Sequence, residues 1–188
     1  MKQNLVTQQT VIEEVKKAVS ETLNSDPSKI EPQHSLIRDL GAESLDFLDI
    51  NYRLEQAFGI KMARHFVLEH VENMFGEGSA IDENSQLTEK AVTLLKSRMG
   101  ESVPVEIKAG MDMDEIPALV TIQSMAGAVM DILDSLPEKC GKCGNAAWQA
   151  ENGVKIKCGS CGEYAAFSNG DDLVKEWITK GQDEEKLF

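Results

Sequence analysis

The sequence predicts a mainly α-helical fold, in which a helical bundle is enlarged by inserted helices and followed by a small β module and a terminal helix. Apolar residues recur at helical spacing through most of the chain before Pro137. After Pro137 the chain instead carries two Cys-x-x-Cys-Gly motifs, with a strand, an Asn-Gly turn and a second strand between them. We therefore expect one domain at residues 1–136 and another at residues 137–188.

The composition is that of a soluble protein that is long enough to bury a core, with 188 residues of which 41% are hydrophobic. The 32 acidic and 19 basic residues give a formal net charge of −13. This excess disfavours nucleic acid and anionic membranes as partners and favours basic protein surfaces. Because the N-terminus has no apolar secretion signal and no apolar run is long enough to span a membrane, we expect a cytoplasmic monomer.

Two helices are expected in the first sixty residues. Thr10 to Glu13 fits a capping box, and the apolar spacing that follows predicts a helix to about Asn24. Prolines and short polar residues from Ser25 to Leu40 predict a long ordered loop. A second helix is expected to begin at Ser44 and to end at Gly59. The apolar stripe expected for its buried face consists of Leu45, Leu48, Leu54 and Phe58, with Phe47 and Ile50 beside them.

Ser44 is the natural N-cap of this second helix. The N-terminus of a helix also favours anions, because its N–H groups and its dipole point toward whatever lies there, so a phosphodiester on Ser44 would be stabilised. The alternative is that Ser44 only caps the helix, which is the commoner role of a serine at such a position. The residues on either side decide between the two.

Asp39–Asp46 reads Asp-Leu-Gly-x-x-Ser-Leu-Asp, and the helix after it ends in Phe-Gly-Ile. This pattern resembles the prosthetic-group site of acyl carrier proteins. The resemblance implies that Ser44 takes 4′-phosphopantetheine from coenzyme A through a phosphopantetheinyl transferase, and that the terminal thiol then holds acyl chains as thioesters. It also implies a carrier that is not an enzyme, served by acyl-transferring and condensing enzymes with basic docking surfaces. The acidic residues that would face those surfaces are Glu43, Asp46, Asp49 and Glu55.

The resemblance covers roughly residues 7–60 and returns at Val120–Leu133, which is similar to the last helix of the family. Between these parts lies an insertion, at about residues 61–118, with two predicted helices that end near Gly76 and Gly100 and a predicted loop from Glu101 to Pro117. We expect the inserted helices to pack on the carrier bundle, to replace the short third helix of the family and to cover the acyl pocket. Asn51-Tyr52 departs from the apolar residues usual there, and the Tyr52 hydroxyl is a candidate contact for a polar acyl chain.

The two cysteine motifs predict a metal site made by Cys140, Cys143, Cys158 and Cys161. Residues 138–168 resemble a zinc ribbon. Four thiolates fill the tetrahedral shell of Zn²⁺, so the metal would be structural and not catalytic. Two disulfides are disfavoured because no secretory signal is present, and a thioredoxin-like redox pair is disfavoured because no βαβ pattern surrounds either motif. We expect Asp171–Lys180 to form an amphipathic helix that packs on the ribbon.

The sequence therefore predicts an acyl carrier protein of a fatty-acid or polyketide-type pathway, with phosphopantetheine on Ser44 and a C-terminal zinc ribbon. One alternative is an unmodified scaffold that recruits partners through its acidic helix and its ribbon. Another is a ribbon protein that binds nucleic acid, which the acidic balance and the scattered lysines of the ribbon disfavour.

Overall fold

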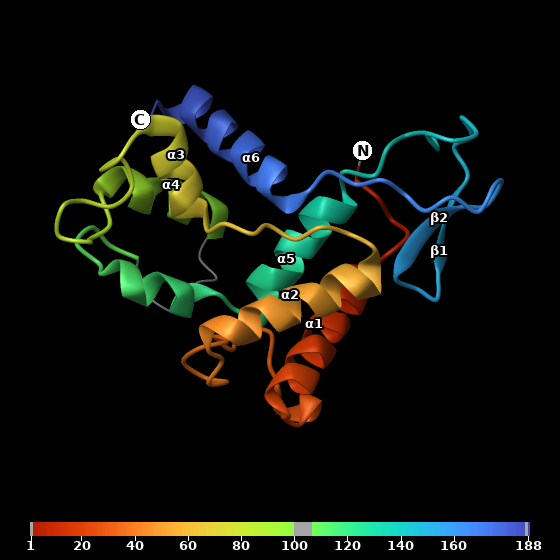
Figure 1. The fold of residues 1–188 in the computed structure, drawn as a ribbon, viewed down its shortest axis with the longest axis horizontal. Helices are drawn as coiled ribbons and strands as arrows, with labels where there is room; N and C mark the ends of the chain where they lie inside the picture. The colour runs from red at the N-terminus through yellow and green to blue at the C-terminus, as the bar shows by residue number, and fades with distance from the viewer. Residues whose placement is uncertain (1, 100–106, 187) are drawn as a thin grey trace. The chain divides into compact units, whose positions relative to one another are not determined.

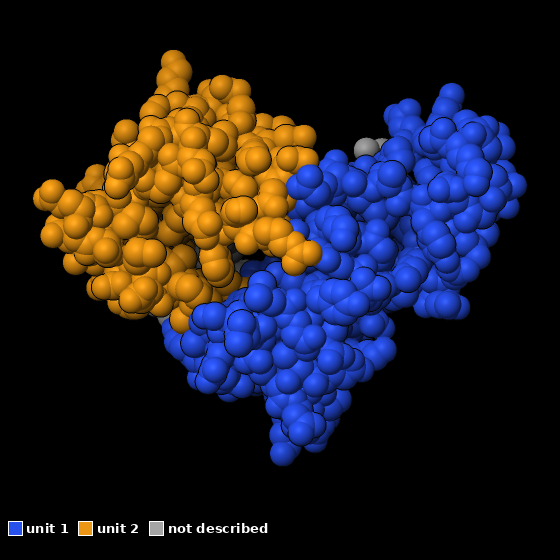
Figure 2. Space-filling model, viewed as in Figure 1, with its two compact units in different colours: residues 1–62, 121–170 blue, residues 63–120, 171–188 orange. Residues whose placement is uncertain are grey.

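A computed structural model describes residues 2–99, 107–186 and 188 (Figure 1). It confirms the mainly α-helical class, with one two-stranded sheet in the described part of the chain. The chain divides into two compact units, residues 1–62 with 121–170 and residues 63–120 with 171–188 (Figure 2). The predicted helix end at Gly100, and the first part of the loop predicted from Glu101, lie outside the described residues.

The first unit contains a bundle of three helices, α1 (Gln8–Leu23), α2 (Ser44–Phe58) and α5 (Ile122–Leu133). Helix α1 contacts both α2 and α5. Each helix buries one apolar face in this bundle, because that face meets the neighbouring helices. Helix α5 therefore completes the bundle, as the sequence predicted. The buried residues of α1 are Val11, Ile12, Val15, Ala18 and Val19.

Helix α1 begins earlier than predicted. Its N-cap is Thr7, whose hydroxyl accepts a hydrogen bond from the backbone N–H of Thr10 at 3.1 Å. The capping box expected at Thr10 is thus wrong by three residues, because Thr7 offers the same chemistry one turn earlier. The helix ends at Asn24, in the left-handed conformation with φ 53°.

The segment from Ser25 to Glu43 is an ordered loop, as predicted. It contains a short 3-10 helix, η1 (Pro27–Lys29), capped by the side chain of Asp26. Further along, Ser35 forms an isolated β-bridge with Thr121, the residue before α5. Ile30 and Leu36 of this loop are buried. These contacts tie the loop to the start of α5.

The β module of the first unit is a hairpin of β1 (Trp148–Glu151) and β2 (Lys155–Cys158). The strands are antiparallel, with Glu151 opposite Lys155. The turn residues Asn152 and Gly153 have φ of 52° and 80°, which is the conformation that an Asn-Gly hairpin turn requires. The strand, turn, strand prediction is confirmed.

The second unit has its own core, made by α3 (Val67–Phe75), α4 (Glu89–Met99), a 3-10 helix η3 (Met113–Leu119) and α6 (Gly170–Glu185). η3 falls in the segment predicted as loop, and Asp112 caps it by accepting the N–H of Asp114 at 2.9 Å. The core residues include Val71, Leu87, Leu94, Leu95, Ile107, Leu119 and Ile178.

One packing prediction is corrected by this core. The apolar faces of the inserted helices bury one another and the C-terminal helix, and their predicted cover over the acyl pocket stays a prediction. Helix α6, expected on the ribbon, instead buries Ile178 in the core of the second unit and packs Val174 and Trp177 against it. Phe188 stacks on Phe75 with ring centroids 4.7 Å apart. The apolar faces of these helices could be predicted from the sequence, but their packing partners could not, because several faces of similar size were available.

Candidate functional site

Ser44 follows a loop whose backbone is held in place. The N–H of Ala42 donates to the carbonyl of Leu36 at 2.8 Å, and the N–H of Gly41 donates to the carbonyl of Ile37 at 3.0 Å. Gly41 has φ 72°, a left-handed conformation that glycine adopts without strain. Ala42 is buried, whereas Ser44 is exposed as the first residue of α2. The loop therefore presents an accessible serine at the beginning of a helix.

The N-cap of α2 is Glu43. The prediction that Ser44 is the N-cap is therefore wrong by one residue. The N–H of Glu43 donates to Oδ2 of Asp46 at 2.7 Å, as in a capping box. Among the described residues no hydrogen bond engages the Ser44 side chain. Because Glu43 and Asp46 close the helix end between them, the Ser44 hydroxyl is left available for chemistry, with the positive end of the helix dipole beside it.

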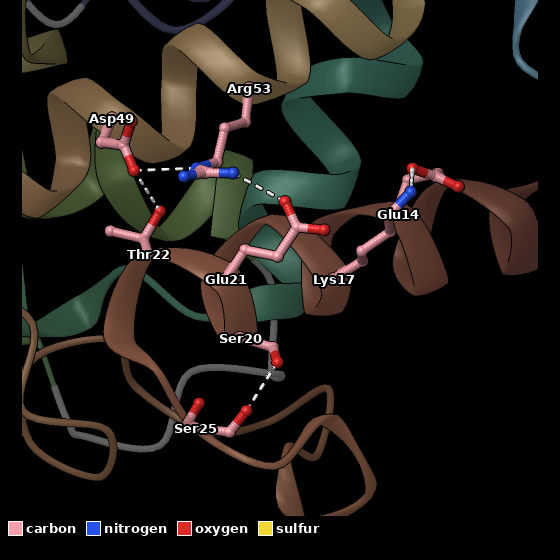
Figure 3. A network of polar contacts seen from close by, with 8 residues as sticks. All are labelled: Glu14, Lys17, Ser20, Glu21, Thr22, Ser25, Asp49 and Arg53. Carbon is pink, nitrogen blue, oxygen red and sulfur yellow. Dashed lines mark hydrogen bonds and ion pairs between the residues drawn. The ribbon is translucent and has the colours of Figure 1, made fainter.

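Asp49, one turn further along α2, links this helix to α1 (Figure 3). Its Oδ2 accepts hydrogen bonds from Nε of Arg53 at 2.8 Å and from Oγ1 of Thr22 at 2.7 Å. Arg53 in turn pairs with Glu21 at 2.6 Å. Arg53 and then Thr22 hold the pKa of Asp49 below its usual value. Asp49 is therefore ionised, but much of its charge is balanced by Arg53.

Glu55, the last of the predicted docking acids, is buried with 4% of its surface exposed. Its Oε1 accepts the backbone N–H of Met62 at 3.0 Å, and Lys61 lies 3.8 Å from its Oε2. The prediction that Glu55 faces partner surfaces is wrong, because its carboxylate fastens the chain that turns after Gly59. The accessible acids at this end of α2 are Glu43, which is exposed, and Asp46 and Asp49, which are half-buried.

The apolar stripe predicted for α2 combines two different faces. Ile50, Leu54 and Phe58 are buried, whereas Leu45, Leu48 and Tyr52 are 78%, 57% and 57% exposed. A rotation of about 100° per residue puts the second set on the opposite side of the helix from the first. That rotation was the signal that the sequence prediction missed. An apolar strip therefore runs along α2 next to Ser44 at the surface, and Tyr52 lies on it and not in an enclosed pocket.

The structure brings together the four predicted metal ligands. The sulfur atoms of Cys140 and Cys161 are 3.6 Å apart, as are those of Cys143 and Cys158, and all four lie within 4.8 Å of one another. All four cysteines are free, so neither pair forms a disulfide. A Zn²⁺ with four sulfurs at ~2.3 Å separates neighbouring sulfurs by about 3.8 Å, which this arrangement nearly matches.

The pKa values of these thiols show how crowded the cluster is. Backbone N–H groups of Cys143 and Lys142 hold the pKa of Cys140 below its usual value. Burial raises the pKa of Cys158, but N–H groups of Ser160 and Cys161 outweigh it and lower that pKa to about 7. A backbone N–H from Glu163 acts to lower the pKa of Cys161, yet burial and the other three thiols raise it to about 12. A bound cation would allow all four thiols to ionise together.

Comparison with known proteins agrees with the site around Ser44. Residues 13–72 match the family model described as the phosphopantetheine attachment site. An acyl carrier protein of Thermosynechococcus vestitus is 37% identical over 57 residues, which cover 30% of this chain and 70% of the relative. This chain belongs to the acyl carrier protein family. As a member, it carries phosphopantetheine.

Other acyl carrier proteins match the same part of the chain. The acyl carrier protein AcpXL of Mesorhizobium japonicum is 42% identical over 53 residues, covering 28% of this chain and 57% of the relative. An acyl carrier protein of Helicobacter pylori is 33% identical over 52 residues, covering 28% and 67%. No solved structure matches significantly. The family model ends at residue 72, so the cysteine cluster and most of the second unit lie beyond it.

Proposed function

We propose that this carrier bears 4′-phosphopantetheine on Ser44 and holds acyl intermediates as thioesters on it, in the cytoplasm, in a fatty-acid or polyketide-type pathway. The observation that carries the proposal is the exposed Ser44 with no side-chain hydrogen bond to the described residues, at the beginning of α2, inside the matched segment. The serine oxygen forms the phosphodiester, and the helix N-terminus stabilises its negative charge. The chain itself performs no acyl chemistry.

The enzymes that modify and use the carrier would dock on the exposed side of α2 that is next to Ser44. There the apolar strip of Leu45, Leu48 and Tyr52 lies beside the carboxylates of Glu43 and Asp46. An apolar centre with an acidic margin suits a basic enzyme surface, which the charges attract and orient before the apolar groups make contact. A phosphopantetheinyl transferase and acyl-transferring or condensing enzymes with such surfaces are the proposed partners.

We further infer that Cys140, Cys143, Cys158 and Cys161 hold one structural Zn²⁺. The sulfur spacing fits a tetrahedral site, and four thiolates leave no open position for a reacting water. Trp148 adds a neighbouring anchor, because its Nε1 donates to the carbonyl of Pro137 at 2.7 Å. The metal would hold together a module that has only two short strands of its own.

Intact mass spectrometry tests the attachment. Wild-type protein incubated with coenzyme A and a broad-specificity phosphopantetheinyl transferase should gain one phosphopantetheine, and Ser44→Ala should gain none. Because Ser44 is not the cap of α2, Ser44→Ala should keep the helical spectrum of wild type. If folded wild type gained no mass with several transferases, the unmodified scaffold would become the better account. A gain on the alanine variant would place the attachment on another residue.

A further inference from the structure

The second unit contains a hollow of about 730 Å³, and nine of its thirteen lining residues lie beyond the family model, which ends at residue 72. It is bounded by α3, by the chain that follows α3 and by η3. Apolar side chains form the floor of the hollow, and acidic side chains surround them. Both kinds of residue come from the same segments of the chain. The lining residues are Phe66, Leu68, Glu69, Glu72, Glu77, Gly78, Ile81, Asp82, Glu83, Met113, Asp114, Ile116 and Pro117.

Two large apolar side chains of this hollow are at the surface. Phe66 is 47% exposed and Met113 is 45% exposed, whereas Leu68 and Ile116 beneath them are buried in the core of the unit. Exposed aromatic residues and methionines are enriched where proteins bind other proteins, and methionine adapts its shape to the side chain that it meets. The floor of the hollow is thus built like the centre of an interface.

The charge of the wall has one sign. Six of the thirteen lining residues are acidic and none is basic. The sequence itself contains no lysine or arginine between Arg64 and Lys90, nor between Lys108 and Lys139. Glu77, Glu83 and Asp114 are exposed, and none of the three makes an ion pair within the described part of the chain. Within the described residues, their charges therefore have no ionic partner.

Two of the remaining acids, Glu72 and Asp82, hold the backbone of the wall in place. Glu72 accepts the backbone N–H groups of Gly78, Ala80 and Ile81, at 2.7, 2.6 and 2.9 Å. Asp82 accepts the N–H groups of Asn84 and Gln86 at 2.8 and 3.0 Å. These bonds order the chain after α3, so the surface is preorganised and binding need not supply that ordering.

We propose that this hollow docks a segment of a partner protein that presents large apolar side chains flanked by lysine or arginine. It is a second docking surface, separate from the strip on α2. An anionic membrane or a nucleic acid would be repelled by the wall. A metal ion bound by the carboxylates would not cover Phe66 and Met113, the exposed apolar residues of the floor. A basic amphipathic segment satisfies both features, because its apolar residues cover Phe66 and Met113 while its cations meet the unpaired carboxylates.

The test uses the unmodified 188-residue chain, so its outcome does not depend on phosphopantetheine. A synthetic helical peptide of leucine and lysine, with its leucines on one face, is titrated into ¹⁵N-labelled protein. We expect amide shifts at residues 66–83 and 113–117, and weaker binding as salt increases. The triple variant Glu77→Gln, Glu83→Gln, Asp114→Asn should raise Kd on the order of tenfold.

The matched control removes the same three charges elsewhere, with Glu31→Gln, Glu176→Gln and Asp183→Asn, all exposed positions. Its Kd should stay within about twofold of wild type, since electrostatic effects are strongest near the bound partner. Met113→Gln, which keeps every charge, should also weaken binding if the apolar floor takes part.

Four results would overturn the proposal. The two triple variants could lose affinity equally, which would make the binding a general effect of net charge. The peptide could shift only residues of α2, or fail to bind at all. Finally, decyltrimethylammonium, titrated in the same way, could shift the amides of the hollow while the peptide does not. The hollow would then be a small-molecule site.

Discussion

His70 and Asp171 are 101 residues apart in the chain, and Nε2 of His70 is 2.9 Å from Oδ1 of Asp171. The same carboxylate accepts the backbone N–H groups of Arg64 at 3.1 Å and His65 at 3.2 Å. His70 is 4% exposed. One acidic residue at the start of α6 thus anchors the segment that leads into α3, and its partner His70 is buried.

The Asp171 contact predicts a loss of stability in acid. Burial acts to raise the pKa of Asp171, but hydrogen bonds from Arg64, His65 and His70 outweigh it and lower that pKa. The stabilisation is present above the unfolded-state pKa near 4 and is lost as pH falls through the lower folded-state value. Asp171→Asn should cost about 1–3 kcal/mol of unfolding free energy at pH 7.

Denaturant unfolding followed from pH 7 to pH 2 checks this. The difference between wild type and Asp171→Asn should shrink as pH falls below about 4, because the wild-type carboxyl is then protonated as well. Asp183→Asn, at an exposed position further along α6, serves as the control. A constant difference over the whole pH range would show that ionisation of Asp171 does not contribute.

Removal of metal should affect the cysteine module alone. Elemental analysis should find one zinc per chain, and a chelator should abolish the dispersed amide signals of residues 138–168, because metal binding supplies much of the folding free energy of so small a unit. Signals of α6 should persist, since its apolar residues belong to the second unit. A well-folded, metal-free preparation with intact module signals would contradict the zinc assignment.

Two leucines of α2 should behave in opposite ways. Leu54 is fully buried, so Leu54→Ala should cost about 2–5 kcal/mol of stability. Leu48 is 57% exposed, so Leu48→Ser should leave stability nearly unchanged and slow phosphopantetheinylation by weakening transferase docking. Thermal unfolding and the rate of mass gain report the two effects. Equal modification rates for Leu48→Ser and wild type would argue against docking on this strip.

Glu55 should matter for folding and not for partner association. Glu55→Ala leaves the N–H of Met62 without its acceptor in a buried place and should cost about 1–3 kcal/mol. Glu43→Gln, at an exposed position, should instead slow association with a basic transferase in a salt-dependent manner. Stopped-flow measurement of the association rate with the transferase at two salt concentrations separates these roles. Glu55→Ala, as the control, should show the same salt dependence as wild type.

Local patterns in the sequence predicted much of the fold and of the candidate site. The Asn-Gly hairpin and the end of α2 at Gly59 follow from backbone preferences of single residues, and the cysteine cluster follows from the spacing of its ligands. Ser44 was placed at the start of α2 because serine favours the beginning of a helix. The capping residues were misplaced by one to three positions, because several neighbouring side chains have the chemistry of a cap.

Contacts between distant segments could not be predicted in this way. The apolar face of α6 was recognised, but its burial with α3 and α4 depends on which of several apolar surfaces it meets. Glu55 was assigned to the surface because the resemblance to acyl carrier proteins implied that the acidic residues of this helix face partner enzymes. Its acceptor role for Met62 becomes visible only when the turn after Gly59 is seen.

The second unit is assembled from two pieces of chain, residues 63–120 and 171–188, and this has a consequence for synthesis on the ribosome. Translation completes the bundle helices and all four cysteines before it reaches α6. During that interval α3 and α4 lack Val174, Trp177 and Ile178, which they bury in the finished core. A nascent chain stalled near residue 170 should therefore hold a foldable carrier beside an incomplete neighbour, which chaperones that bind apolar surface would recognise.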